Sequence, residues 1–413
     1  MNADRRVVVT GIGVVTSVGV GVNAAWDSLV AGRSGIGPLT VFDASAMRCH
    51  IAGEIKDFNP ENYLTPKEAR RLDPFCHYAI AAAEEAMVMS GLKNASVDVT
   101  RAGCLVGGGI GGIRTLEAQA AVLRERGPDR PSPLMVPMMI IDMASGYLSI
   151  RYGYRGPNIA VVTACASGAH AIGEAMWVIK RGDADVMITG GTEACLCPLG
   201  IAGFSAMKAL SERNDDPTHA SRPFDAERDG FVPSEGAGIL ILESYDHARA
   251  RGAQMLCEVV GYGASGDAFH ITAPDPDGDG AYRAINVALK HAGLRPEDIG
   301  YINAHGTSTP LNDKIETLAI KRAFGPHAYK VPVSSTKSMT GHTLGAAGGI
   351  ESSVAIMTMQ RGVIPPTTNY ECKDPDCDLD YVPNTARQAE VKVALNINLG
   401  FGGHNAVLAF KKI

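Results

Sequence analysis

The stretch Asn158–Gly173 constrains the fold most, because its character changes abruptly at Cys165. The β-branched run Ile159–Thr163 predicts a short buried strand, and the small residues after it suit the start of a tightly packed helix. Cys165 therefore falls at a strand-to-helix turn, where free amide N–H groups and the helix dipole are expected to lower a thiol pKa. The alternative is an inert buried cysteine, which is the commoner fate of this residue type.

The second half of the chain repeats the order of the first. Val259–Gly263 echoes Val9–Gly13, and Val331–Gln360 echoes the strand and helix around Cys165. A chain of 413 residues is long enough for one large duplicated unit. We therefore expect an α/β fold built from two related halves, residues 1–252 and 253–413.

Composition excludes several classes of protein. Hydrophobic residues make up 46% of the chain and charged residues 20%, as in ordinary soluble proteins, and the net charge of −6 does not suggest nucleic-acid binding. No window of about 20 apolar residues occurs, so we expect no membrane span. The nine scattered cysteines predict free thiols and a cytoplasmic location, and the lone pair Cys195 and Cys197 has no partners for a metal site.

A glycine-rich loop, Gly107–Gly112, follows a predicted strand and formally matches the Gly-x-Gly-x-x-Gly pattern of dinucleotide sites. The segment after Arg126 is rich in proline, and no third strand ends in an acidic residue at the expected distance. We therefore prefer a backbone turn bordering a cavity.

Two histidines occupy matching positions in the second half. His305 follows the short predicted strand that starts at Tyr301. His342 follows a second predicted strand, and Lys337 lies between that strand and His342. Ligands of open α/β sheets bind outside the carboxyl ends of the strands. A lone histidine there is more often structural, but two in duplicated positions favour a site shared with Cys165.

Such a set permits thioester chemistry. A thiolate can attack a thioester to form an acyl-enzyme, and two neutral imidazoles can stabilise the enolate left when a malonyl group loses carbon dioxide. Lys337 can fix the local charge together with Glu316 or Glu351. Phe401 lies among glycines and can gate a pocket while its N–H faces an oxyanion; the alternative is a packed turn before the last strand.

Four motifs now identify a family. Their residues are Thr-Ala-Cys165-Ala-Ser-Gly, Asn-Ala-His305-Gly-Thr-Ser-Thr-Pro, Ser-Thr-Lys337-Ser-Met-Thr-Gly-His342 and Gly-Phe401-Gly-Gly. In this order they resemble the β-ketoacyl-[acyl-carrier-protein] synthases over essentially the whole chain, and synthase II more than synthase I. The resemblance implies the thiolase-like duplicated α/β fold, in five α-β-α-β-α layers with two mixed sheets.

The same resemblance implies an acyltransferase that condenses an acyl chain with malonyl-carrier protein in fatty-acid elongation. Its partners would be acyl carrier protein, acyl and malonyl thioesters, and a second copy of the chain in a homodimer. No cofactor is expected, because phosphopantetheine arrives on the carrier protein, although some relatives hold a structural monovalent cation. The alternatives are a ketosynthase of a polyketide or specialised lipid pathway, a non-catalytic chain-length partner, which would lack the cysteine, and a Cys–His hydrolase.

The family also implies roles for individual residues. Cys165 would be acylated, His305 and His342 would serve decarboxylation and condensation with support from Lys337, and the N–H groups of Cys165 and Phe401 would form the oxyanion hole. The implied substrate contacts are Thr307, Thr309, Thr272, Ile110, Phe204 and Gly400. The implied carrier-protein contacts are Lys67, Arg70, Arg71 and Lys208.

One segment departs from the family pattern. Ile397-Asn398-Leu399 stands where many members have Asn-Ser-Phe. The departure bears on the cation site that some relatives have near Asn303 and Glu351, and on the movement of the Phe401 loop.

Overall fold

The computed structural model describes residues 5–413, and its main feature is a large mixed sheet built from two sets of five strands. The first set is β1 (Val7–Thr16), β5 (Ala102–Gly107), β6 (Asn158–Val161), β7 (Val186–Glu193) and β8 (Gly236–Ser244). The second set is β9 (Cys257–Gly266), β10 (Tyr301–Asn303), β11 (Val333–Ser334), β14 (Val393–Gly400) and β15 (His404–Lys411).

Both sets have the same topology. The first is ordered β6-β5-β7-β8-β1 and the second β11-β10-β14-β15-β9, so each places its third, second, fourth, fifth and first strand side by side. The parallel pairs fall in corresponding places as well, around β5 and around β10. The predicted duplicated α/β fold is confirmed. The division at Gly252, which lies between α9 (Tyr245–Ala250) and β9, stays a prediction.

The two predicted sheets are joined at one edge. β1 and β9 run antiparallel and pair only at Val8 with Glu258 and at Val9 with Cys257. All ten strands thus belong to one hydrogen-bonded network, while each half keeps its own set of five.

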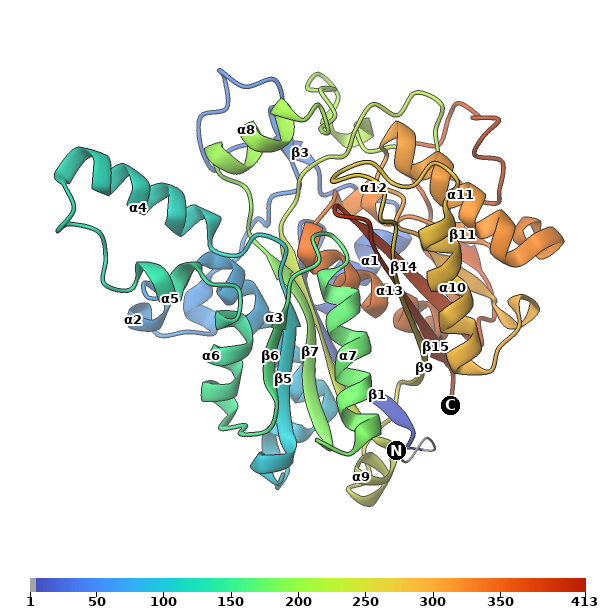
Figure 1. Ribbon diagram of the computed structural model, residues 1–413, viewed down its shortest axis with the longest axis horizontal. Coiled ribbons are helices and arrows are strands. Elements are labelled where there is room, and N and C mark those ends of the chain that lie inside the picture. The colour runs from blue at the N-terminus through green and yellow to red at the C-terminus, as the bar shows by residue number, and fades with distance from the viewer. Residues whose placement is uncertain (1–4) are drawn as a thin grey trace.

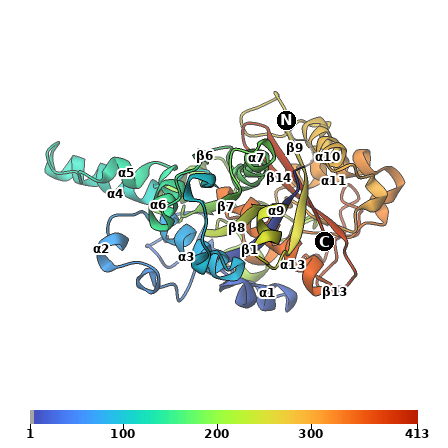
Figure 2. The ribbon, with the colours of Figure 1, turned by 90° about the horizontal axis from the view of Figure 1, so that it is seen from below.

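Helices complete five layers (Figures 1 and 2). α3 (Pro74–Ser90) packs on the outer face of the first half, while α10 (Asp279–Ala292) and α11 (Pro310–Phe324) cover that of the second. Between the halves lie α7 (Ser167–Arg181) and α13 (Ala347–Arg361), which pack against each other and against strands of both sets. The order is the expected α-β-α-β-α.

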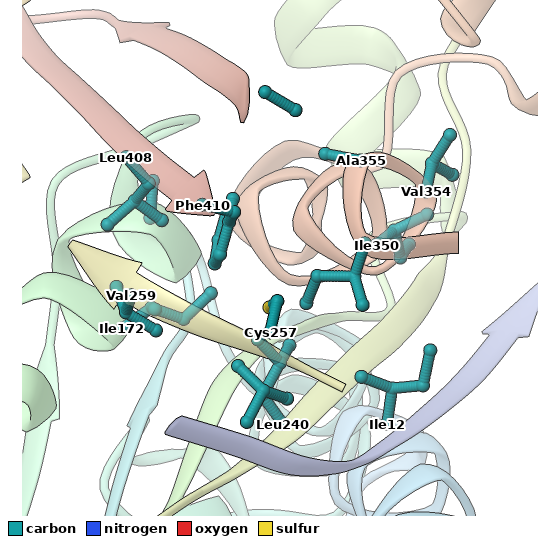
Figure 3. Packing of buried hydrophobic residues seen from close by; sticks show 14 of the residues in the cluster. Ile12, Ile172, Leu240, Cys257, Val259, Ile350, Val354, Ala355, Leu408 and Phe410 are labelled. Carbon is teal, nitrogen blue, oxygen red and sulfur yellow. The ribbon is translucent and has the colours of Figure 1, made fainter. Parts of the chain in front are cut away.

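The central core lies around these two helices. Figure 3 shows side chains of α13, such as Ile350, facing residues of several strands, among them Leu240, Val259 and Phe410, all buried. Burying each such side chain contributes roughly 1.5–3 kcal/mol. A Cβ on Gly238 would lie 2.1 Å from the Ile350 nitrogen, so glycine allows α13 to approach β8 closely.

The remaining elements are short or peripheral. The helices are α1 (Val22–Val30), α2 (Pro66–Ala69), α4 (Ile113–Arg126), α5 (Met135–Met139), α6 (Met143–Tyr152), α8 (Pro198–Ala206) and α12 (Lys337–Thr340). The short strands are β2 (Gly19–Val20), β3 (Gly37–Pro38), β4 (Ile51–Ala52), β12 (Val363–Ile364) and β13 (Arg387–Gln388). Among residues 5–413, no helix has the length and apolar character needed to cross a membrane.

One local expectation was wrong. The run beginning at Ile159 was predicted to be a buried strand, but β6 is the edge strand of the sheet, and Ile159 is 49% exposed. A β-branched run indicates extended backbone and does not distinguish a central strand from an edge strand.

Candidate active site

Cys165 lies in a tight turn between β6 and α7. The preceding Ala164 has φ of 50°, a left-handed conformation that costs free energy in a residue other than glycine. The Ser167 hydroxyl holds this turn, because it accepts a hydrogen bond from the Thr163 N–H at 2.9 Å and donates one to the Ala164 carbonyl at 2.6 Å. Cys165 is buried and lines a cavity of about 380 Å³.

The turn between β14 and β15 lies against the thiol. The Phe401 N–H lies near the Cys165 sulfur and lowers the pKa of its thiol, and both residues line the cavity. A Cβ on Gly400 would lie 2.6 Å from the Thr163 carbonyl oxygen and 3.2 Å from the Cys165 nitrogen. Only glycine therefore fits at position 400, and the arrangement places a backbone donor beside the sulfur.

The expected lowering of the Cys165 pKa was wrong. Burial raises the pKa of this thiol to about 12, although the positive charge of Lys337 opposes the shift. The nearby carboxylate of Glu193 raises it further, and the Phe401 N–H lowers it. Desolvation thus outweighs the stabilisation expected from the start of α7, and the resting group is a neutral thiol.

His305 and His342 line the same cavity as Cys165. Their ring centroids are 5.3 Å apart and the ring planes are nearly perpendicular, at 85°. Burial, reinforced by the charge of Lys337, holds the pKa of both imidazoles well below the usual range. Both rings are therefore neutral at physiological pH, which is the form that can donate a hydrogen bond from one nitrogen while keeping the other unprotonated.

Lys337 is buried and forms an ion pair with Glu351 of α13. The second oxygen of Glu351 accepts a hydrogen bond from the Asn398 side chain at 2.7 Å, so the segment that departs from the family pattern takes part in this network. Glu316, the alternative partner, instead accepts the backbone N–H groups of His305 at 2.6 Å and Gly306 at 2.8 Å. One carboxylate balances the lysine, and the other holds the turn that carries His305.

The predicted substrate contacts divide into two groups. Thr272, Thr307, Thr309 and Gly400 line the cavity, and the hydroxyls of Thr307 and Thr309 are 2.9 Å apart. Ile110 and Phe204 do not line it; they pack against the apolar cluster that includes Cys165. The thiol therefore lies between a polar approach and an apolar interior.

Sequence reasoning missed Phe231. Its ring lies edge-on to His342 at 5.2 Å and to Phe204 at 5.5 Å, and it lines the cavity. Nothing in the surrounding sequence distinguishes it from an ordinary core phenylalanine.

The predicted carrier-protein contacts are not gathered in one place. Lys208 is exposed and lines the cavity. Lys67 lies on α2, with Arg70 and Arg71 just after it, and all three are exposed outside the cavity lining.

The glycine-rich loop binds a carboxylate of its own chain. The N–H groups of Gly109, Ile110 and Gly111 donate to Glu193, at the end of β7, over 2.8–3.2 Å. Successive N–H groups that converge in this way form an anion-binding nest. The loop is the preferred backbone turn, with Glu193 as the anion in its nest, but none of residues 107–112 lines the cavity around Cys165. Sequence reasoning did not single out Glu193.

Two buried amide oxygens lie in the region where some relatives hold a cation, near Asn303. Asn303 and Asn396 pair across β10 and β14, and the side-chain oxygen of each lacks a hydrogen-bond partner among residues 5–413. Amide oxygens are suitable ligands for a hard cation, so these residues fit a monovalent ion. In the same part of the chain, no group of three histidine, cysteine or acidic side chains could hold a metal.

Comparison with known proteins identifies the family. Residues 4–248 match the β-ketoacyl synthase N-terminal domain, and residues 256–371 match the C-terminal domain. The chain is 55% identical over 408 residues to 3-oxoacyl-[acyl-carrier-protein] synthase 2 of a Synechocystis species, which covers 99% of this chain and 98% of the relative. It is 50% identical over 417 residues to the Staphylococcus aureus protein of the same name, covering 100% and 99%.

Solved structures agree. A β-ketoacyl synthase from Burkholderia phymatum superposes with a TM-score of 0.92 at 34% identity, covering 99% of this chain and 100% of that one. A ketosynthase of a type II polyketide synthase, solved with its acyl-carrier protein, superposes with a TM-score of 0.91 at 37% identity, covering 99% of each chain. The chain therefore belongs to the β-ketoacyl synthase family.

Proposed function

We propose that this chain is an elongating 3-oxoacyl-[acyl-carrier-protein] synthase, an acyltransferase that joins an acyl chain to malonyl-carrier protein by decarboxylative Claisen condensation. The observation that carries the proposal is the shared cavity of Cys165, His305 and His342. Relatives that are 50–55% identical over nearly the whole chain are named for this activity.

In the first half-reaction, the Cys165 sulfur attacks the acyl thioester carbonyl. The carbon–sulfur bond to the carrier breaks, and the proton of the Cys165 thiol goes to the departing thiolate, so no net charge is created. The Phe401 N–H beside the sulfur, together with that of Cys165, is placed to stabilise the oxyanion. Because the buried thiol is neutral at rest, its proton must leave before or as the new carbon–sulfur bond forms, since the thiolate is the nucleophile.

In the second half-reaction, the malonyl carboxylate leaves as carbon dioxide and its electron pair forms an enolate. Neutral His305 and His342 donate hydrogen bonds to the thioester oxygen that gains negative charge. The enolate carbon then attacks the acyl group on Cys165, and the carbon–sulfur bond breaks to regenerate the thiolate, which takes a proton from water. Burial keeps both imidazoles neutral, and Lys337 reinforces this because its charge disfavours a second cation nearby.

The remaining assignments follow from position. Thr272, Thr307 and Thr309 contact the phosphopantetheine arm in the polar approach, whereas Ile110 and Phe204 line the acyl site. Lys208 at the cavity, with Lys67, Arg70 and Arg71, meets the acidic carrier protein. A monovalent cation near Asn303 would be structural and would be coordinated by the buried amide oxygens of Asn303 and Asn396.

The chain also acts as a homodimer in this proposal. The edge strand β6 leaves backbone hydrogen-bonding groups unpaired on one side, and Ile159 within it and Val162 just after it are 49% and 52% exposed. An exposed apolar edge is suited to pairing with a second copy. All nine cysteines are free, which suits a reducing cytoplasm.

Product analysis tests the function. Purified chain, acyl-carrier protein and malonyl-carrier protein should yield a β-ketoacyl thioester two carbons longer and one carbon dioxide per turnover. Free fatty acid as the product would instead indicate a Cys–His hydrolase. A product carrying several successive keto groups would indicate a polyketide ketosynthase, which some of the structural neighbours are. No turnover would favour the silent chain-length partner despite the presence of Cys165.

A further inference from the structure

Glu193 is a buried carboxylate whose position the reaction steps above do not explain. It is fully buried at the end of β7, and all the hydrogen bonds that it accepts within residues 5–413 come from backbone N–H groups. Burial raises the pKa of Glu193 to about 7 against the effect of its backbone donors, and when ionised it raises the Cys165 pKa and so opposes formation of the thiolate. A carboxylate that works against the nucleophile in this way needs another reason to be there.

The hydrogen bonds of Glu193 connect the two halves. Gly109 donates at 2.8 Å, and Ile110 and Gly111 each donate at 3.1 Å, all from the glycine-rich loop of the first half. Gly345, three residues after His342 in the second half, also donates at 3.1 Å. One carboxylate thus ties the loop that carries Ile110 to the segment that follows a histidine of the site.

The glycines of both segments are shaped to this carboxylate. A Cβ on Gly109 would lie 2.6 Å from the Glu193 Oε2, and one on Gly345 would lie 2.9 Å from that oxygen and 2.2 Å from the Gly109 nitrogen. A Cβ on Gly109 would also lie 3.5 Å from the carbonyl oxygen of Ala164, next to the nucleophile. The acyl-site loop, the Cys165 turn and the His342 segment therefore meet around Glu193.

We propose that Glu193 is a positioning residue that fixes Ile110 against the apolar cluster containing Cys165, and thereby sets acyl-chain preference and the rate of acyl transfer. Three of its four donors belong to the acyl-site loop, and only one follows His342. Loss of the carboxylate should therefore affect loading of the acyl chain more than decarboxylation of malonyl. This inference rests on the proposed condensing function.

The main variant is Glu193→Gln, which keeps the shape but turns an amide NH₂ toward backbone N–H groups. We expect acylation of Cys165 to slow about tenfold, which corresponds to the loss of roughly one hydrogen bond to a charged group, with a changed order of preference across a series of acyl-carrier proteins. Decarboxylation of malonyl-carrier protein should stay within about threefold of wild type. The matched control is Glu243→Gln, which changes a buried carboxylate on β8 that is bound by Arg251. It should alter neither the ratio of the acylation rate to the decarboxylation rate nor the order of acyl-chain preference.

A second variant tests the same contact with the charge intact. Gly109→Ala places a methyl group against Glu193 and should produce the same selective loss, whereas Gly300→Ala, whose Cβ meets only ordinary contacts from 3.6 Å outward, should not. This pair remains informative if Glu193→Gln fails to fold.

The inference is overturned if both variants keep the wild-type order of acyl preference, or if both half-reactions fall by the same factor. A wild-type chain that forms no β-ketoacyl product would instead refute the proposed function, so the two failures are distinguishable.

Discussion

The two halves share one topology and have opposite chemistry near the cavity. In the first half, the turn before α7 carries a single thiol that packs in an apolar cluster. In the second half, the corresponding region before α13 carries Lys337, which pairs with Glu351 of α13, and His342, and His305 follows β10. The two halves are in close contact at Gly348, where an added Cβ would lie 2.1 Å from the Ala169 nitrogen. Duplication supplies the scaffold, and divergence near the strand ends places the thiol in one half and both histidines in the other, which in our proposal separates the two half-reactions.

The sharpest way to break the comparison is to remove the thiol. Cys165→Ala should reduce the rate of condensation on the order of 10³-fold or more. Malonyl decarboxylation should persist, because His305 and His342 remain. Radiolabelled carbon dioxide release and product formation are measured in parallel. Cys195→Ala, another buried cysteine of the same apolar cluster, is the control and should keep both activities. Loss of decarboxylation in Cys165→Ala would contradict the separation of the halves.

The second test removes the lysine of the polar half. Lys337→Ala leaves the Glu351 carboxylate buried without its cation, which should lower the free energy of unfolding by about 3–5 kcal/mol. Decarboxylation should fall on the order of 10²-fold. The double variant Lys337→Met with Glu351→Gln should recover part of the stability, measured by urea unfolding, and little of the activity. Full recovery of activity would show that the charge of Lys337 has no part in the reaction.

A third buried histidine sharpens the contrast between catalytic and structural roles. His170 of α7 is hydrogen-bonded to Tyr262 at 2.6 Å, and burial lowers its pKa to about 4. The folded-state pKa lies below the unfolded value, so His170 does not lower the free energy of unfolding above pH 6.5. As the pH falls toward 4, the unfolded chain takes up this proton before the folded chain does, and the free energy of unfolding drops by up to about 3 kcal/mol. His170→Asn should flatten the fall in unfolding free energy between pH 7 and 5. An unchanged pH dependence would show that His170 is not buried as a neutral ring.

The smallest expected effect concerns the turn between β14 and β15, the last two strands of the second half. Phe401→Ala should slow acyl transfer roughly tenfold and decarboxylation less, because the side chain gates the cavity while the backbone N–H is retained. Phe401→Leu keeps apolar bulk and should be milder. Stopped-flow acylation and carbon dioxide release separate the two effects. Equal losses in both assays would argue against a gating role.

Much of this site was predictable because it depends on local pattern. Cys165, His305 and His342 each follow a recognisable strand and precede small residues, so the rule about strand ends located them. The environment of each group was not predictable from its neighbours in sequence. The Cys165 pKa is raised by burial from several distant segments, and no local motif reports that burial.

Contacts between distant segments were the hardest to foresee. Glu193 looks like an ordinary residue at a strand end until the structure brings Gly109 and Gly345 to its carboxylate. The choice between Glu316 and Glu351 as partner of Lys337 likewise required the packing of α13. The departure at Asn398 is compatible with the ion pair because its amide binds Glu351 directly.

The central claim is that the first half carries the acyl chain and the second half generates its attacking partner. Intact-protein mass after mixing with acyl-carrier protein, before and after malonyl-carrier protein is added, tests it most directly. The account predicts one acyl adduct, mapped to Cys165, that disappears as the β-ketoacyl product appears. An adduct on another cysteine, or one that disappears as free acid, would contradict it.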